Sequence, residues 1–194
     1  QHRGQEGAGI VSFNGHNFFS IRREGLVGDN FNNANILSQL PGKTAIGHVR
    51  YSTTGESKAE NLQPLFANLA LGGFACAHNG NLTNTLSLKK ELILKGSIFQ
   101  TTSDTEIILQ LVARSTKGTL IEKLIDTLYQ IRGAYSLVIL TNKKLIGVRD
   151  PFGIRPLVLG QKDGAYVLAS ETCALDMIGA EFVRDVKNGE IVVI

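Results

Sequence analysis

Two blocks of strand-like sequence enclose a block of amphipathic helices, and this order limits the chain to a layered fold. Alternating and β-branched residues predict strands near 8–13, 18–24, 44–50 and 65–77. Leucine and isoleucine at helical spacing then predict helices over 83–95, 104–114 and 120–131. Strand patterns return at 134–141, 144–149, 156–161, 165–170 and 190–194, interrupted by a short helix near 173–178. This order predicts an α+β domain with mainly antiparallel sheets, each burying one face against another layer.

The chain of 194 residues has the composition of an ordinary globular domain, with 43% hydrophobic and 19% charged residues. Its formal charge of +3 is small and spread along the sequence, which argues against nucleic acid or an anionic membrane as a partner. No run approaches the roughly 18 apolar residues of a membrane span. Cys76 and Cys173 lie far apart without other ligand residues nearby. We therefore expect neither a disulfide scaffold nor a metal site, and we expect a reducing, cytoplasmic location.

The two ends of the sequence suggest a piece of a longer protein. The first residues are Gln1, His2 and Arg3, without an initiator methionine, and the last are the strand-like GEIVVI without a polar tail. No repeat or flexible linker divides the residues between them. We therefore expect residues 1–194 to form a single domain that is truncated at its N-terminus and lacks a downstream domain.

The most informative polar motif is His78-Asn79-Gly80, which is predicted as a turn between an apolar strand and a helix start. The side-chain amide of Asn79 and the backbone N–H of Gly80 could place two hydrogen-bond donors at one point. Paired donors of this kind stabilise the oxyanion of a tetrahedral intermediate. The competing interpretation is a turn without chemical function, because Asn-Gly is the strongest short hairpin signal.

Arg50 and Asp104 are charged residues at the ends of predicted elements. Arg50 closes the strand TAIGHVR, where its planar fork of donors suits bidentate capture of a carboxylate. Asp104 precedes an apolar helix, where it could accept a ligand ammonium group. Each also has a structural explanation, as an exposed strand-end arginine and as part of a helix start with a Ser103–Glu106 capping box. Together the two charges would clamp the main-chain end of a free amino acid, and with the oxyanion donors they describe an amidase.

Six motifs, in order, resemble the class II glutamine amidotransferases. They are QHRGQEGAGI (1–10), GHVRYSTTG (47–55), AHNGNLTN (77–84), SDTE (103–106), RGAYS (132–136) and RDPFGIRPL (149–157). The resemblance covers essentially the whole chain and implies the four-layer αββα sandwich of N-terminal nucleophile hydrolases. Tyr51 and the segment 81–83 resemble the branch whose second domain binds phosphoribosyl pyrophosphate more than the branch that acts on a sugar phosphate.

The resemblance implies a role for each matching residue of a glutamine site. Arg50 would bind the α-carboxylate of L-glutamine, and Asp104 would bind its α-ammonium group. Asn79 and Gly80 would stabilise the oxyanion. Further residues would line the pocket or support the nucleophile: Tyr51, Thr53, Arg3 and Gly4.

The family's nucleophile is a cysteine at the first residue of the mature chain, and its own α-amino group acts as the general base. An α-amino pKa of about 7.7–8.0 suits that task. This sequence contains no such cysteine, because Cys76 and Cys173 are internal, lack a free α-amine and show no feature that promises a lowered pKa. The chain alone is therefore expected to be inactive.

The resemblance also implies partners outside this sequence. Ammonia would pass to a C-terminal phosphoribosyltransferase domain, which converts phosphoribosyl pyrophosphate to 5-phosphoribosylamine in the first step of purine synthesis. That domain would use Mg²⁺, some relatives carry an iron–sulfur cluster and many form tetramers, whereas no cofactor is expected in the glutaminase domain. The tight turn predicted over 150–153 lies at the side facing the partner domain in the family, which makes Arg155 a candidate interface residue.

Two other functions stay open from the sequence. One is another class II amidotransferase, such as the enzyme that makes glucosamine 6-phosphate, which would carry a downstream sugar-isomerase domain. The other is a catalytically dead relative that senses glutamine or scaffolds a complex. A non-nucleophilic residue at the native N-terminus would favour this second function.

Overall fold

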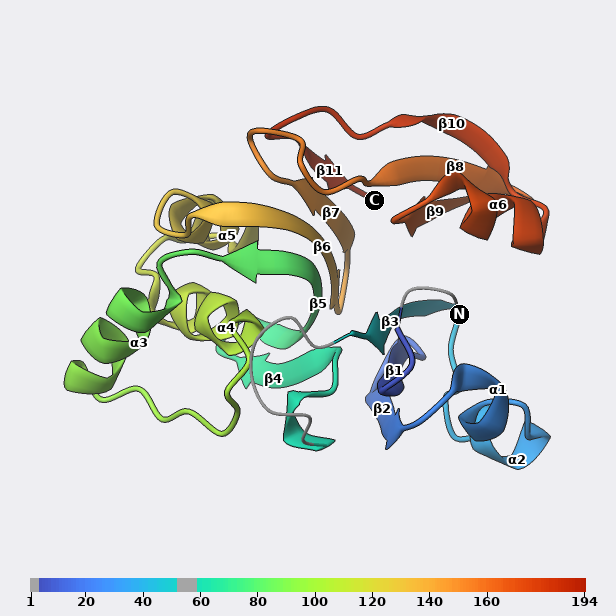
Figure 1. Ribbon diagram of the computed structural model, residues 1–194, viewed down its shortest axis with the longest axis horizontal. Helices are drawn as coiled ribbons and strands as arrows, with labels where there is room; N and C mark the ends of the chain where they lie inside the picture. Colours follow the sequence, from blue (N-terminus) through green and yellow to red (C-terminus); the bar gives the residue numbers. More distant parts are fainter. Residues whose placement is uncertain (1–3, 52–58) are drawn as a thin grey trace.

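The computed structural model describes residues 4–51 and 59–194, which form strands and helices arranged in layers (Figure 1). In this part of the chain the strands build three sheets, and their pairings are antiparallel. The central sheet has the order β11-β7-β6-β5-β4, the first sheet β2-β1-β3 and the third sheet β10-β8-β9. The strand bounds are β1 (Gly7–Phe13), β2 (Phe18–Glu24), β3 (Thr44–Arg50), β4 (Leu65–Leu69), β5 (Gly72–Leu82), β6 (Gly133–Thr141), β7 (Leu145–Arg149), β8 (Val158–Lys162), β9 (Ala165–Ala169), β10 (Glu181–Asp185) and β11 (Ile191–Val193).

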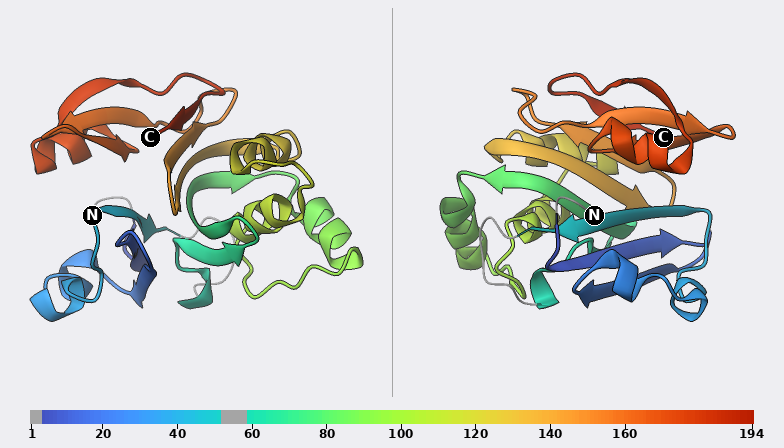
Figure 2. Two further views of the ribbon diagram at one scale, coloured as in Figure 1. Left: turned by 180° about the vertical axis from the view of Figure 1, so that it is seen from behind. Right: turned by 45° about the vertical axis from the view of Figure 1, so that its right-hand side comes forward.

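The helices α3, α4 and α5 cover one face of the central sheet, and the first and third sheets lie over its opposite face (Figure 2). Phe74 and Leu137 of the sheet pack with Ile107 and Leu124 of the helices in the largest apolar cluster. Another cluster packs α6 against the third sheet. These layers confirm the predicted αββα sandwich. The helix bounds are α1 (Val27–Asn30), α2 (Ala34–Leu37), a 3₁₀ helix (Ala59–Asn61), α3 (Thr85–Leu94), α4 (Thr105–Arg114), α5 (Leu120–Leu128) and α6 (Thr172–Ile178).

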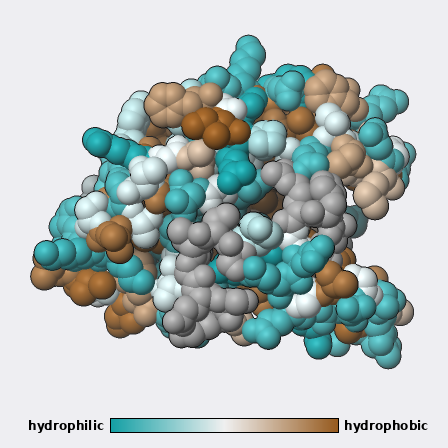
Figure 3. Space-filling view, viewed as in Figure 1, coloured by the Kyte–Doolittle hydropathy of each residue, from teal (hydrophilic) through white to brown (hydrophobic). Residues whose placement is uncertain are grey.

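The helix α3 buries less apolar surface than its leucine pattern suggests. Leu88 and Leu92 are buried, but Leu86 and Leu94 are 86% and 79% exposed. Apolar side chains accordingly gather at the left edge of the molecule in Figure 3, over α3. No helix in the described ranges is long and apolar enough to cross a membrane.

The segment predicted as one strand over 65–77 is two strands, because the chain reverses between β4 and β5. The strand β5 then continues through His78-Asn79-Gly80 to Leu82, so the predicted turn at this motif is wrong. The cause is non-local, since β6 pairs with β5 as far as Leu82 and holds the motif extended. Gly80 has φ = +150°, and a Cβ at this position would clash with the backbone of β6. Only glycine fits this close approach.

The predicted capping box of Ser103 with Glu106 is also wrong. The Glu106 carboxylate folds back and accepts the N–H of Thr101 at 2.7 Å and its hydroxyl at 2.8 Å. A buried carboxylate needs such donors, and Glu106 is 8% exposed. A capping box occurs instead at α5, between Thr119 and Glu122.

Besides the 3₁₀ helix, three elements of the described chain have no counterpart in the sequence prediction: α1, α2 and β10. The two helices have four residues each, and none of these residues is buried. In β10 the apolar side chains of Phe182 and Val183 are exposed. Elements without a buried face leave no apolar periodicity in the sequence, so the pattern could not reveal them.

The turn that follows β7 is built around the buried side chain of Asp150. The Gly153 N–H donates to the Asp150 carbonyl at 3.0 Å, which confirms the predicted tight turn. The Asp150 carboxylate accepts three backbone N–H groups at 3.0–3.2 Å, the last of them from Arg155. The Arg149 guanidinium donates to the carbonyls of Arg155, Gly153 and Val186 at 3.0, 2.9 and 2.7 Å. These bonds fix the backbone of Arg155.

We predict that Asp150→Ala lowers the free energy of unfolding by about 2–4 kcal/mol, because three backbone N–H groups of the turn lose their acceptor, the buried Asp150 carboxylate. Urea unfolding of the purified protein measures this change. Asp176→Ala removes an exposed carboxylate from α6 and should cost less than about 0.5 kcal/mol. Equal effects of the two substitutions would show that the Asp150 carboxylate does not hold the turn.

Candidate functional site

A cavity of about 390 Å³ opens where the end of β3, the middle of β5, the start of α4 and the segment after β7 converge. Its volume lies within the range of small-ligand sites, about 300–1,000 Å³. Backbone and polar side chains make up most of its lining: Gly47, His48, Val49, Arg50, Tyr51, Gln63, His78, Asn79, Gly80, Ser103, Asp104, Arg155 and Ser170.

Five of the residues predicted for a glutamine site line this one cavity: Arg50, Tyr51, Asn79, Gly80 and Asp104. Tyr51 lies at the rim, with 69% of its surface exposed. The predicted Gly4 is buried, and its Cα lies so close to the Arg50 carbonyl that a Cβ would not fit. The predicted Arg3 and Thr53 lie outside the described residues. The fold therefore brings the five residues together, and their chemical roles remain predictions.

Gly80 presents its backbone N–H to the cavity because β5 is paired on only one side here. The pairing with β4 ends at Cys76. Beyond it, the N–H of His78 donates to Gln63 Oε1 at 2.7 Å and the N–H of Leu82 donates to Asp104 Oδ2 at 2.9 Å. Alternate residues of a strand direct their N–H groups to the same edge, so the Gly80 N–H lies between these two.

The opposite residue on β6 supports this orientation of Gly80. Tyr135 is the register partner of Gly80, and its carbonyl accepts the Asp150 N–H at 2.9 Å on the β7 side. Tyr135 and Gly80 therefore form a pair that exchanges no backbone hydrogen bonds. The open edge of β5 carries a donor toward the cavity beside the Asn79 side chain.

Arg50 is buried, which excludes the alternative of an exposed strand-end arginine. Its side chain is 7% exposed, and Nη1 donates to the Asn61 carbonyl at 3.1 Å. Nε lies 3.8 Å from a Glu6 carboxylate oxygen, which is an ion pair without a hydrogen bond. Nε and Nη2 are both inaccessible to water and without a hydrogen-bond partner. Two buried donors on one edge of a guanidinium match the two oxygens of a carboxylate.

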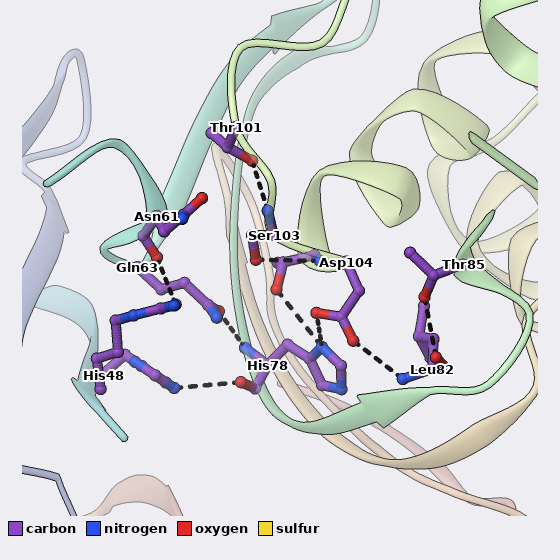
Figure 4. Close-up of polar contacts among 11 residues, drawn as sticks. His48, Asn61, Gln63, His78, Leu82, Thr85, Thr101, Ser103 and Asp104 are labelled. Atoms are coloured by element: carbon purple, nitrogen blue, oxygen red, sulfur yellow. Dashed lines mark hydrogen bonds and ion pairs between the residues drawn. The ribbon is translucent and has the colours of Figure 1, made fainter. Parts of the chain in front are cut away.

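Asp104 supplies the negative charge of the cavity, and its carboxylate is held by neighbours on β5 (Figure 4). Oδ1 lies 3.3 Å from His78 Nδ1, and Oδ2 accepts the Leu82 N–H. Burial alone would raise the pKa of Asp104, but the hydrogen bonds from His78 and Leu82 outweigh it and lower the pKa below its ordinary value. Asp104 is therefore ionised at neutral pH.

His48 lies two residues before Arg50 on β3 and links that strand to β5 (Figure 4). Its Nε2 lies 3.1 Å from the His78 carbonyl oxygen, which can only accept, so Nε2 carries the proton. Burial, aided by the nearby His78, lowers the pKa of His48 from 6.5 to about 4. His48 is therefore neutral at physiological pH and acts as a fixed donor.

Several lining residues were not placed in a glutamine site by the sequence, among them His48, Gln63, Arg155 and Ser170. His48 could have been found from the strand pattern. Residues two apart on a strand lie on the same face, so His48 shares a face with the predicted site residue Arg50. Gln63 accepts the His78 N–H, and no motif around Gln63 in the sequence indicated this role. Arg155 was considered as an interface residue, and the structure places it on the cavity wall.

Neither cysteine lines the cavity. Cys76 is fully buried in β5, and burial raises the pKa of its thiol. Cys173 is exposed, and the hydrogen bond to the Glu171 carboxylate raises the pKa of its thiol. Thiolates are disfavoured at both positions. The described residues also contain no cluster of three His, Cys, Asp or Glu side chains that could hold a metal ion.

Comparison with known proteins gives a consistent result. A family model described as the glutamine amidotransferase domain matches residues 48–177. The chain is 55% identical over 193 residues to an amidophosphoribosyltransferase of Rhizobium etli and 48% identical over 195 residues to that of Bacillus subtilis. Both alignments cover 100% of this chain, but only 39% and 41% of the relatives.

A solved structure of glutamine phosphoribosylpyrophosphate amidotransferase from B. subtilis, complexed with ADP and GMP, has the same fold. It superposes with a TM-score of 0.94 at 47% identity, covering 100% of this chain and 42% of that one. A second structure, titled as the allosteric regulatory enzyme of purine biosynthesis, superposes with a TM-score of 0.95 at 47% identity over the same shares of the two chains.

We predict that protonation of His48 destabilises the fold between pH 6.5 and about 4. In this window the unfolded chain binds a proton at His48 and the folded chain does not, so the free energy of unfolding falls as the pH falls. The slope contributed by His48 is at most about 1.4 kcal/mol per pH unit. Urea unfolding from pH 7 to 4.5 measures it.

His48→Gln should flatten that pH dependence, because glutamine can still donate to the His78 carbonyl but does not titrate. His16→Gln, at an exposed position between β1 and β2, is the matched control and should leave the slope of the wild type. A His48→Gln slope identical to that of the wild type would contradict the lowered pKa.

Proposed function

The chain belongs to the glutamine amidotransferase domain family, and we propose that it is the glutaminase domain of an amidophosphoribosyltransferase. It would release ammonia from L-glutamine for transfer to phosphoribosyl pyrophosphate, giving 5-phosphoribosylamine in the first step of purine synthesis. The observation that carries the proposal is the convergence of Arg50, Asp104, Asn79 and Gly80 on one cavity.

Recognition of glutamine would rest on its two main-chain charges. The α-carboxylate would accept from the buried Nε and Nη2 of Arg50, which have no hydrogen-bond partner in the described chain. The α-ammonium would donate to the Asp104 carboxylate, whose two oxygens each retain acceptor capacity after binding His78 and Leu82. A bidentate and a charge-assisted contact together fix the orientation of a small ligand.

The opposite end of the substrate would face the oxyanion donors. Attack on the side-chain amide carbon makes a tetrahedral oxyanion, which the Asn79 amide and the Gly80 N–H would stabilise. Collapse forms a thioester and releases ammonia, and water then hydrolyses the thioester to glutamate. The β5–β6 pairing fixes the Gly80 N–H and the backbone of Asn79 before the substrate binds, and donors held in advance are the most effective.

The nucleophile would be an N-terminal cysteine supplied by residues of the full-length protein that precede Gln1. A second cavity of about 880 Å³ runs between the unpaired edges of β3 and β9, over β6 and β7. Its floor is apolar and includes Ile46, Val138 and Leu168. An extended segment in this groove would pair with both edges. Gly47 lines both cavities, and β3 and β9 lead from the groove toward Arg50 and Ser170 of the first cavity, where the segment would present its cysteine and α-amino base.

The transferase half of the reaction would belong to the remainder of the full-length protein, since the chain spans 39–42% of the relatives described above. A phosphoribosyltransferase domain with Mg²⁺, a tetrameric assembly and a cytoplasmic location are predictions for that protein. So is an iron–sulfur cluster, which only some members would carry. The alternatives of another class II enzyme or an inactive relative are tested by the same assays of glutaminase and transferase activity.

In the full-length protein, Asp104→Asn should raise the KM for glutamine by about tenfold or more, because the ammonium loses its charged partner while the Leu82 N–H keeps an acceptor. Synthesis from free ammonia should be unchanged, since it needs no glutamine site. Asp176→Asn, on the surface of α6, is the control. A normal KM for glutamine in Asp104→Asn would remove Asp104 from the pocket.

Asn79→Asp and Asn79→Ala should each lower the glutaminase kcat by about 10²–10³-fold, because both remove the amide donor from the oxyanion. Asn79→Asp keeps the shape of the side chain, so it separates loss of the donor from loss of packing. Steady-state ammonia release measures kcat and KM for each variant. A normal kcat in both variants would show that Asn79 does not stabilise the oxyanion and is only a structural residue of β5.

A further inference from the structure

Arg155 places a second guanidinium on the wall of the cavity, besides that of Arg50. Its side chain is half-buried, and its Nε is inaccessible to water and without a hydrogen-bond partner. No acid among the described residues forms an ion pair with it. A buried donor on a charged group is costly unless a partner satisfies it, so this atom points to a ligand.

The position of Arg155 is set by its backbone and not by its charge. Its N–H is held by Asp150 Oδ2 and its carbonyl by Arg149 Nε, each at 3.0 Å. The side chain is therefore delivered to the cavity from a fixed point on the segment between β7 and β8. Changes beyond Cβ leave these hydrogen bonds in place, which makes Arg155 suitable for substitution.

The permanent charges on the cavity wall do not balance. Arg50 and Arg155 contribute two positive charges, and Asp104 contributes one negative charge. Glu6 does not line the cavity, but its carboxylate lies 3.8 Å from Arg50 Nε, so Arg155 is the cation without an ion-pair partner among the described residues. His48 is neutral at physiological pH. A bound glutamine carries one carboxylate and one ammonium group, which would match Arg50 and Asp104 and leave Arg155 without a counter-charge. An amino acid with a second carboxylate would supply it.

We propose that Arg155 binds the side-chain carboxylate of L-glutamate, the acid left when the amide of glutamine is hydrolysed. This inference rests on the proposed glutaminase function. It makes Arg155 a specificity-determining residue that discriminates the charged product from the neutral, nearly isosteric substrate. The consequence is competitive inhibition by glutamate, so that a larger fraction of the sites holds the product when glutamate is abundant.

The test compares the Ki for L-glutamate with the KM for L-glutamine in the glutaminase reaction of the full-length protein. Arg155→Met, which keeps length but removes charge and donors, should raise the ratio of Ki to KM by about tenfold or more. Arg155→Lys keeps the charge and should hold the ratio within about threefold of the wild type. Arg114→Met removes a charge from the exposed end of α4 and should leave the ratio unchanged.

A wild-type ratio in Arg155→Met would overturn the inference, including the case in which Ki and KM rise together. If Arg155→Met is too slow to assay, calorimetric titration of the folded variant with L-glutamate decides, and wild-type affinity would again overturn it. Thermal unfolding verifies that each variant is folded. A wild-type protein without glutaminase activity would instead contradict the proposed function.

Discussion

The site depends on one unpaired half of a central strand. Beyond Cys76, β5 has β6 on one side and no strand of the described chain on the other. Backbone N–H groups in such a place must find other partners. The His78 N–H donates to Gln63 and the Leu82 N–H donates to Asp104. The Gly80 N–H between them is directed into the cavity. The need to satisfy a strand edge therefore positions an acid, an amide and a backbone donor around one volume.

The charged groups of the cavity likewise bind the protein backbone and keep capacity for a ligand. Asp104 satisfies the backbone of β5 and retains a negative charge, because His78 and the Leu82 N–H keep its pKa low. Arg50 donates from one nitrogen to the Asn61 carbonyl, and its other two nitrogens have no hydrogen-bond partner. In both Asp104 and Arg50, some atoms of the charged group hold the side chain in place, and the remaining hydrogen-bonding capacity is left for a ligand. Such preorganisation lets a small ligand bind without first rearranging the protein.

Much of this arrangement could be predicted from the sequence, because it depends on local signals. The strand order, the main helices and the placement of Arg50 and Asp104 at element ends follow from apolar periodicity and residue type. The motif His78-Asn79-Gly80 was misassigned as a turn, because its local preference for a turn is overridden by pairing with a strand that begins about fifty residues later. The predicted capping box at Glu106 was wrong for a similar reason, because its carboxylate binds Thr101 in the preceding loop and not the helix start. The position of Arg155 depends on hydrogen bonds from the side chains of Asp150 and Arg149 to its backbone, and the predicted turn over 150–153 did not reveal these bonds.

Asp150 also joins the cavity to the far end of the chain. Its carbonyl accepts the N–H of Gly189, and Arg149 binds the carbonyl of Val186, so both ends of the loop before β11 are tied to the segment that carries Arg155. Since β11 begins at Ile191, a displacement of that last strand would be transmitted to the guanidinium on the cavity wall. The position of the last strand and the shape of the cavity wall are therefore joined by a short series of hydrogen bonds.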